Sequence, residues 1–222
     1  MTTVIASGYA VGVDAGQEPS GTPAGSDQPS ARERIVRSAA ALVRERGVHG
    51  VGLRQIVAHA DGPRGSLQRY FPGGKTQLVT EALKLVGAEL LDETASRLAK
   101  ATTLADAIDA IFAPWHRVLT ESDFTMGCPI AATVIDASAD DKQRREARDL
   151  LEQGRDAVRA LLVTYGVPES TAEDDASVLL AALEGALILS RANQSTAPLD
   201  TVQRFFTTSL TQFAANPAAR AR

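Results

Sequence analysis

The segment from Pro63 to Phe71, with the sequence PRGSLQRYF, combines long hydrogen-bonding side chains with a few apolar ones. Arginine and glutamine side chains can form paired hydrogen bonds with the major-groove edges of guanine and adenine. Arg64 and Gln68 are therefore the candidates for contacting bases. The chemistry predicted for this segment is recognition of a base sequence in double-stranded DNA.

Other polar side chains of the same segment can reach bases or phosphates, namely Ser66, Arg69 and Tyr70. Leu67 and Phe71 lie one helical turn apart, so they would face inward together. A helix that enters the major groove needs an exposed polar side and an apolar side that contacts a small core. The segment is thus predicted to be a short recognition helix.

Candidates for phosphate contacts flank the predicted recognition helix. Arg54 and Gln55 stand at the start of the preceding predicted helix, where they could contact the DNA backbone. Lys75 and Thr76 open the following helix, where backbone N–H groups and a cation can hold a phosphate group. The complete candidate DNA-binding set is Arg54, Gln55, Arg64, Ser66, Gln68, Arg69, Tyr70, Lys75 and Thr76.

Apolar residues at helical spacing predict the elements that position these side chains. A first helix is expected from residue 31 up to Gly47, a second over 53–60 and a third over 63–71. The dipeptide Asp61-Gly62 predicts the turn before the third helix, and Pro63 suits a first helical position because its missing N–H is not needed there. Two short helices with a longer one across them are the plan of a helix-turn-helix unit.

The rest of the chain is also predicted to be helical. The expected helices cover residues 75–99, 103–121, 129–138, 141–165, 170–194 and 199–214. The fold class is therefore all-α, with an N-terminal three-helix helix-turn-helix DNA-binding domain over 30–76 and a larger C-terminal helical domain for ligand binding and dimerisation over 77–222. Pro114 predicts a kink and residues 124–129 a loop. Residues 1–29, rich in Gly, Ser, Pro and Ala without periodicity, are expected to form a disordered tail.

Charge is distributed unevenly along the chain, whose formal net charge is −4. Residues 31–76 contain nine basic and three acidic side chains, whereas residues 77–222 contain 14 basic and 21 acidic ones. A basic segment within an acidic protein is expected if that segment alone faces phosphate groups.

Composition excludes several classes of protein. A hydrophobic content of 44% is enough for a packed core, and the 5% of aromatic residues together with abundant Ala, Leu, Arg and Glu favours helix. No run approaches the roughly 18 apolar residues that span a bilayer, and no secretory signal is visible, so we expect no membrane partner and a cytoplasmic location. Cys128 is the single cysteine and cannot form an internal disulfide.

Enzymatic alternatives find little support. Residues 72–76 superficially resemble a phosphate-binding loop, but Arg69 stands where that motif needs glycine, and no buried strand precedes it. The three histidines lack metal-ligand spacing, and Cys128 has no paired cysteine or adjacent histidine. No catalytic residue, metal or cofactor is predicted. The alternative that remains is a helical small-molecule-binding or interaction module without DNA binding.

The stretch from Arg32 to Leu83 resembles the N-terminal domain of the tetracycline-repressor (TetR) family. The features that carry the resemblance are the first helix with Gly47, Leu53-Arg54-Gln55-Ile56-Val57, Pro63-Arg64-Gly65-Ser66-Leu67, Tyr70-Phe71-Pro72 and Lys75. The doubled glycine in Phe71-Pro72-Gly73-Gly74-Lys75 and the block Gly127-Cys128-Pro129-Ile130-Ala131-Ala132 are similar to the branch that contains the lincomycin-resistance repressor.

The resemblance implies a homodimer whose last two helices form a four-helix bundle, and a ligand pocket within each larger domain. An effector would spread the two DNA-binding units, so that they no longer fit successive grooves. Three features depart from the family pattern. Gly52 replaces the usual Ser or Thr cap, Asp61-Gly62 replaces small turn residues, and Gln68 replaces the usual Tyr. The operator sequence therefore does not carry over.

A small hydrophobic effector is expected among apolar side chains with a few polar groups in the larger domain. Trp115 and His116 are the foremost candidates, by stacking and by hydrogen bonding respectively. The candidate ligand-binding residues are Phe112, Trp115, His116, Leu119, Phe124, Met126, Cys128, Ile130 and Val134.

The last two predicted helices are dominated by small and aliphatic residues beyond what one face against a core requires. We expect a symmetric dimer interface here, with Gly185 permitting close approach. The candidate interface residues are Leu179, Leu183, Ala186, Leu187, Phe205, Phe206 and Leu210.

Overall fold

The computed structural model describes residues 29–63, 65–136 and 138–215 of the 222-residue chain. Within these ranges the regular secondary structure is entirely α-helical, which confirms the predicted all-α fold class. The helices are α1 (Ala31–Arg46), α2 (Leu53–His59), α3 (Ser66–Tyr70), α4 (Gly74–Leu98), α5 (Leu104–Glu121), α6 (Pro129–Ile135), α7 (Asp141–Thr164), α8 (Glu169–Asn193) and α9 (Ala197–Ala215). The predicted tail lies almost wholly outside the described residues.

Local signals fix both ends of α1. The Ser30 hydroxyl accepts a hydrogen bond from the Glu33 amide at 3.2 Å, and the Glu33 carboxylate accepts one from the Ser30 amide at 2.7 Å. This reciprocal capping satisfies donors that a helix N-terminus leaves free, and the hydrogen bond from the Ser30 amide lowers the pKa of Glu33. Gly47 ends the helix with φ of 71°, a left-handed conformation that glycine adopts without strain.

The third helix begins later than predicted. Its first helical residue is Ser66, not Pro63. Pro63 is compatible with a first helical turn, but Gly65 follows two residues later and disfavours helix by about 1 kcal/mol relative to alanine. The chain between α2 and α3 is therefore longer than the pattern suggested, and Gln68 lies in the middle of a helix of only five residues.

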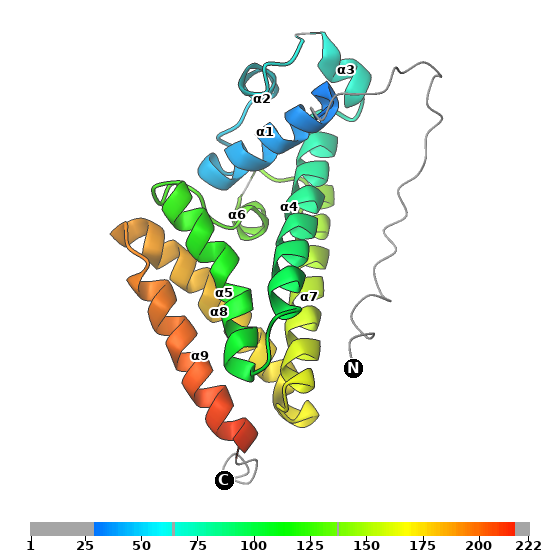
Figure 1. The fold of residues 1–222 in the computed structure, drawn as a ribbon. Coiled ribbons are helices and arrows are strands. Elements are labelled where there is room, and N and C mark those ends of the chain that lie inside the picture. Colours follow the sequence, from blue (N-terminus) through cyan, green and yellow to red (C-terminus); the bar gives the residue numbers. More distant parts are fainter. Residues whose placement is uncertain (1–28, 64, 137, 216–222) are drawn as a thin grey trace.

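The three N-terminal helices gather at one end of the molecule (Figure 1). Their small core has Ile35, Ile56 and Phe71 among its fully buried side chains. α4 starts at this end and runs beside α7 through the larger unit, where α5, α8 and α9 lie against one another (Figure 1). α6 contacts both α1 and α7, so it lies at the junction between the two units.

α4 supplies residues to two hydrophobic cores. Leu78 and Ala82 belong to the small core, whereas Val79 and Leu83 belong to the larger one. All four side chains are at most 1% exposed. α4 is consequently a shared wall between the N-terminal helices and the rest of the protein.

The larger unit follows the predicted helices closely. α5 continues from Leu104 to Glu121 through Pro114, where the sequence predicts a kink, and α6 ends at Ile135, three residues before the predicted end. In the described ranges, no helix is both long and apolar enough to cross a membrane.

Candidate functional site

The described part of α3 has the two-sided character predicted for a recognition helix. Gln68 and Arg69 are exposed, while Phe71 at its end is 1% exposed and Leu67 contacts the small core. The Arg69 guanidinium lies over the ring of Tyr70, 5.6 Å from its centre, and the attraction between the cation and the ring stabilises this position of the arginine side chain. Arg64 and the side chain of Ser66 lie outside the described residues.

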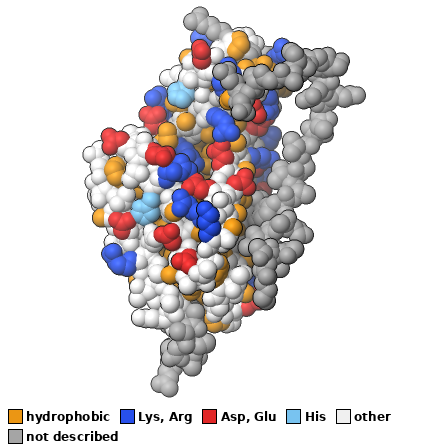
Figure 2. Space-filling model, viewed as in Figure 1, with side chains coloured by type: hydrophobic (Ala, Val, Ile, Leu, Met, Phe, Trp, Pro, Cys, Tyr) orange, Lys and Arg blue, Asp and Glu red, His pale blue; other side chains and the backbone are white. Residues whose placement is uncertain are grey.

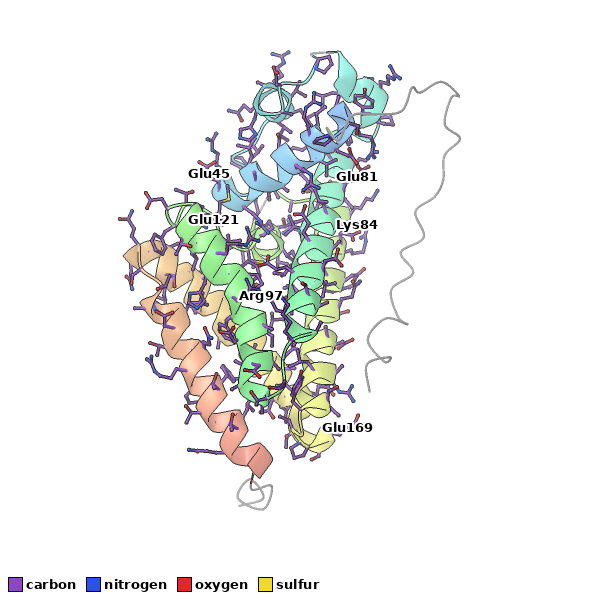
Figure 3. The ribbon with its side chains drawn as sticks, viewed as in Figure 1. Glu45, Glu81, Lys84, Arg97, Glu121 and Glu169 are labelled. Carbon is purple, nitrogen blue, oxygen red and sulfur yellow. The ribbon has the colours of Figure 1, made fainter. Side chains whose placement is uncertain are left out.

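Arginines of α1 are neutralised by acidic residues of α4. Arg32 pairs with Glu81 at 2.6 Å, and Arg37 pairs with Glu89. Glu81 lies on α4 beside α1 (Figure 3), and basic and acidic side chains adjoin one another across the middle of the molecular face in Figure 2. Arg34 instead donates a hydrogen bond to a backbone carbonyl at the end of α2. These three arginines hold α1 against α4 and the end of α2, so they are not available to bind phosphate.

Of the other described cations of the basic segment, Arg44 is largely buried and Arg46 pairs with Glu45, both in the last turn of α1, and three more lie around α3. Arg54 at the start of α2, Arg69 on α3 and Lys75 at the start of α4 form no ion pair with any described residue. Arg54 and Arg69 are exposed and Lys75 is half-buried. The excess positive charge seen in the sequence is thus concentrated on one surface, formed by α2, α3 and the first turn of α4.

Two predicted phosphate contacts have structural partners inside the protein. The Gln55 side-chain oxygen accepts a hydrogen bond from the amide of Gly52, the N-cap of α2, at 2.9 Å, which is the half of a capping box that does not need a Ser or Thr side chain. The Thr76 hydroxyl donates to the carboxylate of Asp140, the N-cap of α7. The Gln55 oxygen and the Thr76 hydroxyl are therefore engaged within the protein, and Asp140 gave no local signal because it lies 64 residues from Thr76 in sequence.

The predicted ligand-binding residues divide into three groups. Phe112, Trp115, Leu119, Cys128 and Ile130 are at most 8% exposed and belong to the larger core, with Phe124 packed against it. Met126 is half-buried in the loop before α6, whereas Val134 is 40% exposed. His116 is turned toward α9, where its ring nitrogen lies 3.0 Å from the side-chain oxygen of Gln203. The structure therefore brings the buried residues of the larger core together, whereas exposed Val134 and His116, which faces α9, lie apart from them.

A buried acidic residue was missed by sequence reasoning. Glu184 on α8 contacts the Cys128 thiol, and Cys128 in turn caps α6 through a hydrogen bond from the Ala131 amide at 3.4 Å. Burial raises the pKa of Glu184, and the hydrogen bond with Cys128 only partly opposes this effect. The pKa of Cys128 is also raised by burial. A glutamate in the middle of a helix gives no sequence signal that distinguishes it from a solvated one.

Replacing Glu184 with glutamine is expected to stabilise the protein at neutral pH. Since the folded-state pKa lies above the ordinary value of 4.5, ionisation costs stability as the pH rises above that value. The substitution should raise the thermal midpoint at about pH 8, by roughly 2–4 °C for each 1 kcal/mol gained, and have little effect at about pH 4. Thermal melts at both pH values test this. Glu173→Gln, on the exposed side of α8, is the matched control, and equal midpoints for Glu184→Gln and wild type at high pH would contradict the burial.

The residues predicted for the dimer interface are mostly internal. Only Phe205 is exposed, at 61%. The other six are 0–5% exposed and belong to the larger core of the protomer: Leu179, Leu183, Ala186, Leu187, Phe206 and Leu210. α8 packs against α5, α7 and α9, so one side of this helix is already covered within a single chain.

A different apolar face of α8 and α9 is exposed. Val178, Ile188, Leu189 and Phe205 are 55–63% exposed. A groove of about 590 Å³ runs between the two helices beside Leu189 and is otherwise lined by Ala182, Gly185, Ala186, Asn193, Ser195, Ala197, Pro198, Thr201 and Val202. A Cβ atom added at Gly185 would meet nothing within 4 Å, so this side of α8 is open to a close approach.

A short polar helix beside α2, with unpaired cations around it and an all-helical unit behind it, defines a helix-turn-helix regulator. Residues 35–82 match the family of bacterial regulatory proteins described as tetR, and residues 104–205 match the C-terminal domain of LmrA/YxaF-like transcriptional regulators. The chain belongs to the TetR family, and the predicted family and branch are confirmed. It is a DNA-binding transcriptional regulator and not an enzyme.

Individual relatives agree with this assignment. The chain is 35% identical over 181 residues to an HTH-type transcriptional regulator of Mycobacterium tuberculosis, covering 78% of this chain and 90% of the relative. It is 28% identical over 169 residues to the HTH-type transcriptional regulator LmrA of Bacillus subtilis, covering 76% and 90%. A TetR transcriptional regulator from Chloroflexus aurantiacus is similar in structure, with a TM-score of 0.68, 29% identity and coverage of 82% of this chain and 94% of the other.

Proposed function

We propose that this regulator is a repressor that binds palindromic operator DNA as a homodimer and is released by a small hydrophobic effector. The observation that carries the proposal is the surface of α2, α3 and the start of α4, where Arg54, Arg69 and Lys75 have no acidic partner among the described residues. Unpaired cations around an exposed recognition helix are suited to phosphates on both sides of a major groove. The protein would act in the cytoplasm.

Dimerisation is supported by the exposed apolar face of α8 and α9. A symmetric dimer brings the same patch of both copies together, so a groove beside a protruding side chain is self-complementary. Leu189 or Phe205 of one copy could fill the groove beside Leu189 of the other. Two recognition helices held about 34 Å apart would then fit successive major grooves.

An effector response is supported by the polar pair in the larger core. Glu184 and Cys128 lie among apolar and aromatic side chains, which is the mixture that small-molecule sites use. Dimers with different separations of the two recognition helices are different conformations. A ligand that binds one of these conformations more tightly would shift the population toward it. The proposed effector site is therefore centred on Cys128 and Trp115 rather than on His116.

The proposed function is tested by DNA binding of the full-length protein. Duplexes are selected from a random library with the wild-type chain, and fluorescence anisotropy then measures Kd at several salt concentrations. We expect a palindromic consensus and a logarithm of affinity that falls linearly with the logarithm of salt concentration. Absence of any selected sequence at low ionic strength would contradict the proposal.

Replacing Lys75 with alanine should weaken binding to all duplexes about equally. A lysine that contacts a phosphate releases about one counterion, so its loss should reduce the slope of the salt dependence by about 1. Lys100→Ala removes the same charge just beyond the opposite end of α4 and is the matched control, with an expected slope equal to wild type. A Lys75→Ala protein with the wild-type slope would place this side chain away from the DNA.

A further inference from the structure

The DNA-binding unit and α8 are joined by hydrogen bonds at the C-terminal end of α1. Arg191, in the last turn of α8, donates from one terminal nitrogen to the carbonyl oxygen of Glu45 at 3.4 Å and to that of Thr125 at 2.8 Å. The Gly127 amide donates to the carbonyl oxygen of Arg44 at 3.3 Å. Arg191 thus contacts both α1 and the loop that leads into α6.

The surroundings of Arg191 fit this bridging position. The side chain is half-buried, and the C-terminal carbonyl groups of a helix carry partial negative charge that a cation stabilises. Gly127 leaves room for it, since an added Cβ atom would lie 3.1 Å from a guanidinium nitrogen and 3.2 Å from Cδ of Arg191. Glu45 and Glu121, at the ends of α1 and α5, mark this junction in Figure 3.

Arg191 lies on the same helix as the exposed apolar face. The exposed Ile188 and Leu189 precede Arg191 by less than one turn, and Asn193, two residues after it, lines the groove. A side chain that contacts α1 therefore extends from the helix proposed to meet the second copy. A large change in the angle between α1 and α8 would stretch or break the Arg191 hydrogen bonds.

The DNA-binding unit stays attached without Arg191, through the core residues of α4 and through another polar contact. The Asp136 carboxylate, at the end of α6, accepts a hydrogen bond from the His49 amide at 2.7 Å. Burial alone would raise the pKa of Asp136, but the hydrogen bonds from Ser138 and His49 outweigh it and lower the pKa. Asp136 therefore stays ionised at neutral pH and continues to hold the loop between α1 and α2.

We propose that Arg191 is a positioning residue that fixes the orientation of the DNA-binding unit, residues 31–71, relative to the dimerisation helix α8. In the dimer, this orientation sets the distance between the two recognition helices and hence the spacing of operator half-sites that the protein accepts. The inference rests on the proposed dimeric operator binding. The shared core of α4 and the contact between Asp136 and His49 attach the unit, and the contribution assigned to Arg191 is the direct polar link between α8 and the end of α1.

The test compares Arg191→Ala and Arg191→Lys with wild type on three duplexes. The first is the palindrome selected by the wild-type chain, the second has two base pairs inserted at its centre, and the third contains a single half-site. We expect Arg191→Ala to bind the selected palindrome about three- to thirtyfold more weakly and to lose most of the discrimination against the insertion. Half-site affinity and the dimeric state in sedimentation should be unchanged.

Arg191→Lys keeps the charge but offers a more compact donor, so it should retain intermediate discrimination. Arg204→Ala, which removes an exposed arginine of α9, should discriminate as wild type does. If Arg191→Ala keeps the full preference for the original spacing, or if its half-site affinity falls as much as its palindrome affinity, the positioning role is wrong. If wild type itself shows no preference for spacing, the proposed dimeric binding fails and the inference with it.

Discussion

Replacing Leu189 with aspartate is expected to leave the protein folded but monomeric. Leu189 is 55% exposed on α8 and borders the groove between α8 and α9, so the protomer loses little by the change. In a symmetric dimer the substitution places two carboxylates in an apolar interface, where unpaired charges are costly. A monomer presents one recognition helix instead of two, so affinity for a palindrome should fall by about 10²–10⁴-fold.

Sedimentation equilibrium and anisotropy titration with the selected palindrome measure the two effects of Leu189→Asp. Ile135→Asp is the control for dimerisation, because Ile135 is 78% exposed at the end of α6 and away from the groove. The control should remain dimeric. A Leu189→Asp protein that sediments as a dimer at micromolar concentration would show that the second copy binds elsewhere.

Replacing Phe71 with alanine is expected to destabilise the DNA-binding unit by about 3–5 kcal/mol, because it opens a cavity in a core. Phe71 is 1% exposed and joins the end of α3 to the small core, and the Arg32 guanidinium lies over its ring at 5.2 Å from the centre. Among the other described side chains of α3, the half-buried Leu67 and Tyr70 also pack against this core, but neither is fully buried. Operator binding should therefore be lost at temperatures where the larger unit remains folded.

Urea denaturation followed by circular dichroism, together with anisotropy, measures these consequences of Phe71→Ala. Phe71→Leu keeps most of the volume and should cost less than about 1.5 kcal/mol while retaining DNA binding. Sedimentation should show that both variants remain dimeric, since no residue of α8 or α9 belongs to the small core that contains Phe71. Wild-type stability and affinity for Phe71→Ala would mean that α3 is held by contacts other than this ring.

Elements whose limits depend on nearby residues could be predicted from the sequence. Apolar residues at helical spacing from residue 31, followed by Gly47, were sufficient to predict α1, although the caps Ser30 and Glu33 were not singled out. The start of α3 was predicted too early because proline permits a helical start without enforcing one. Gly65, which disfavours helix, became the N-cap, and α3 begins after it at Ser66.

The two sides of α8 could not be separated by pattern alone. Leu183 and Leu187 face the larger core, while Ile188 and Leu189 are exposed, although all four are large and aliphatic. Which side faces inward depends on how α8 meets α5, α7 and α9, and these contacts join distant parts of the chain. Arg191 was missed for the same reason, since its partners are backbone carbonyls 66 and 146 residues away.

α4 also limits which motions could connect the proposed effector site to DNA. Rotation of α4 about its own axis would expose Leu78 on one side or Val79 on the other, and each exposure costs hydrophobic free energy. Tilting of the whole helix as a rigid body keeps Leu78 and Val79 in their cores and avoids that cost. A displacement at the C-terminal end of α4 would then move α3 at the other end. A fragment ending at residue 76 would lack Leu78, Ala82 and Val86 from its core and should not fold autonomously.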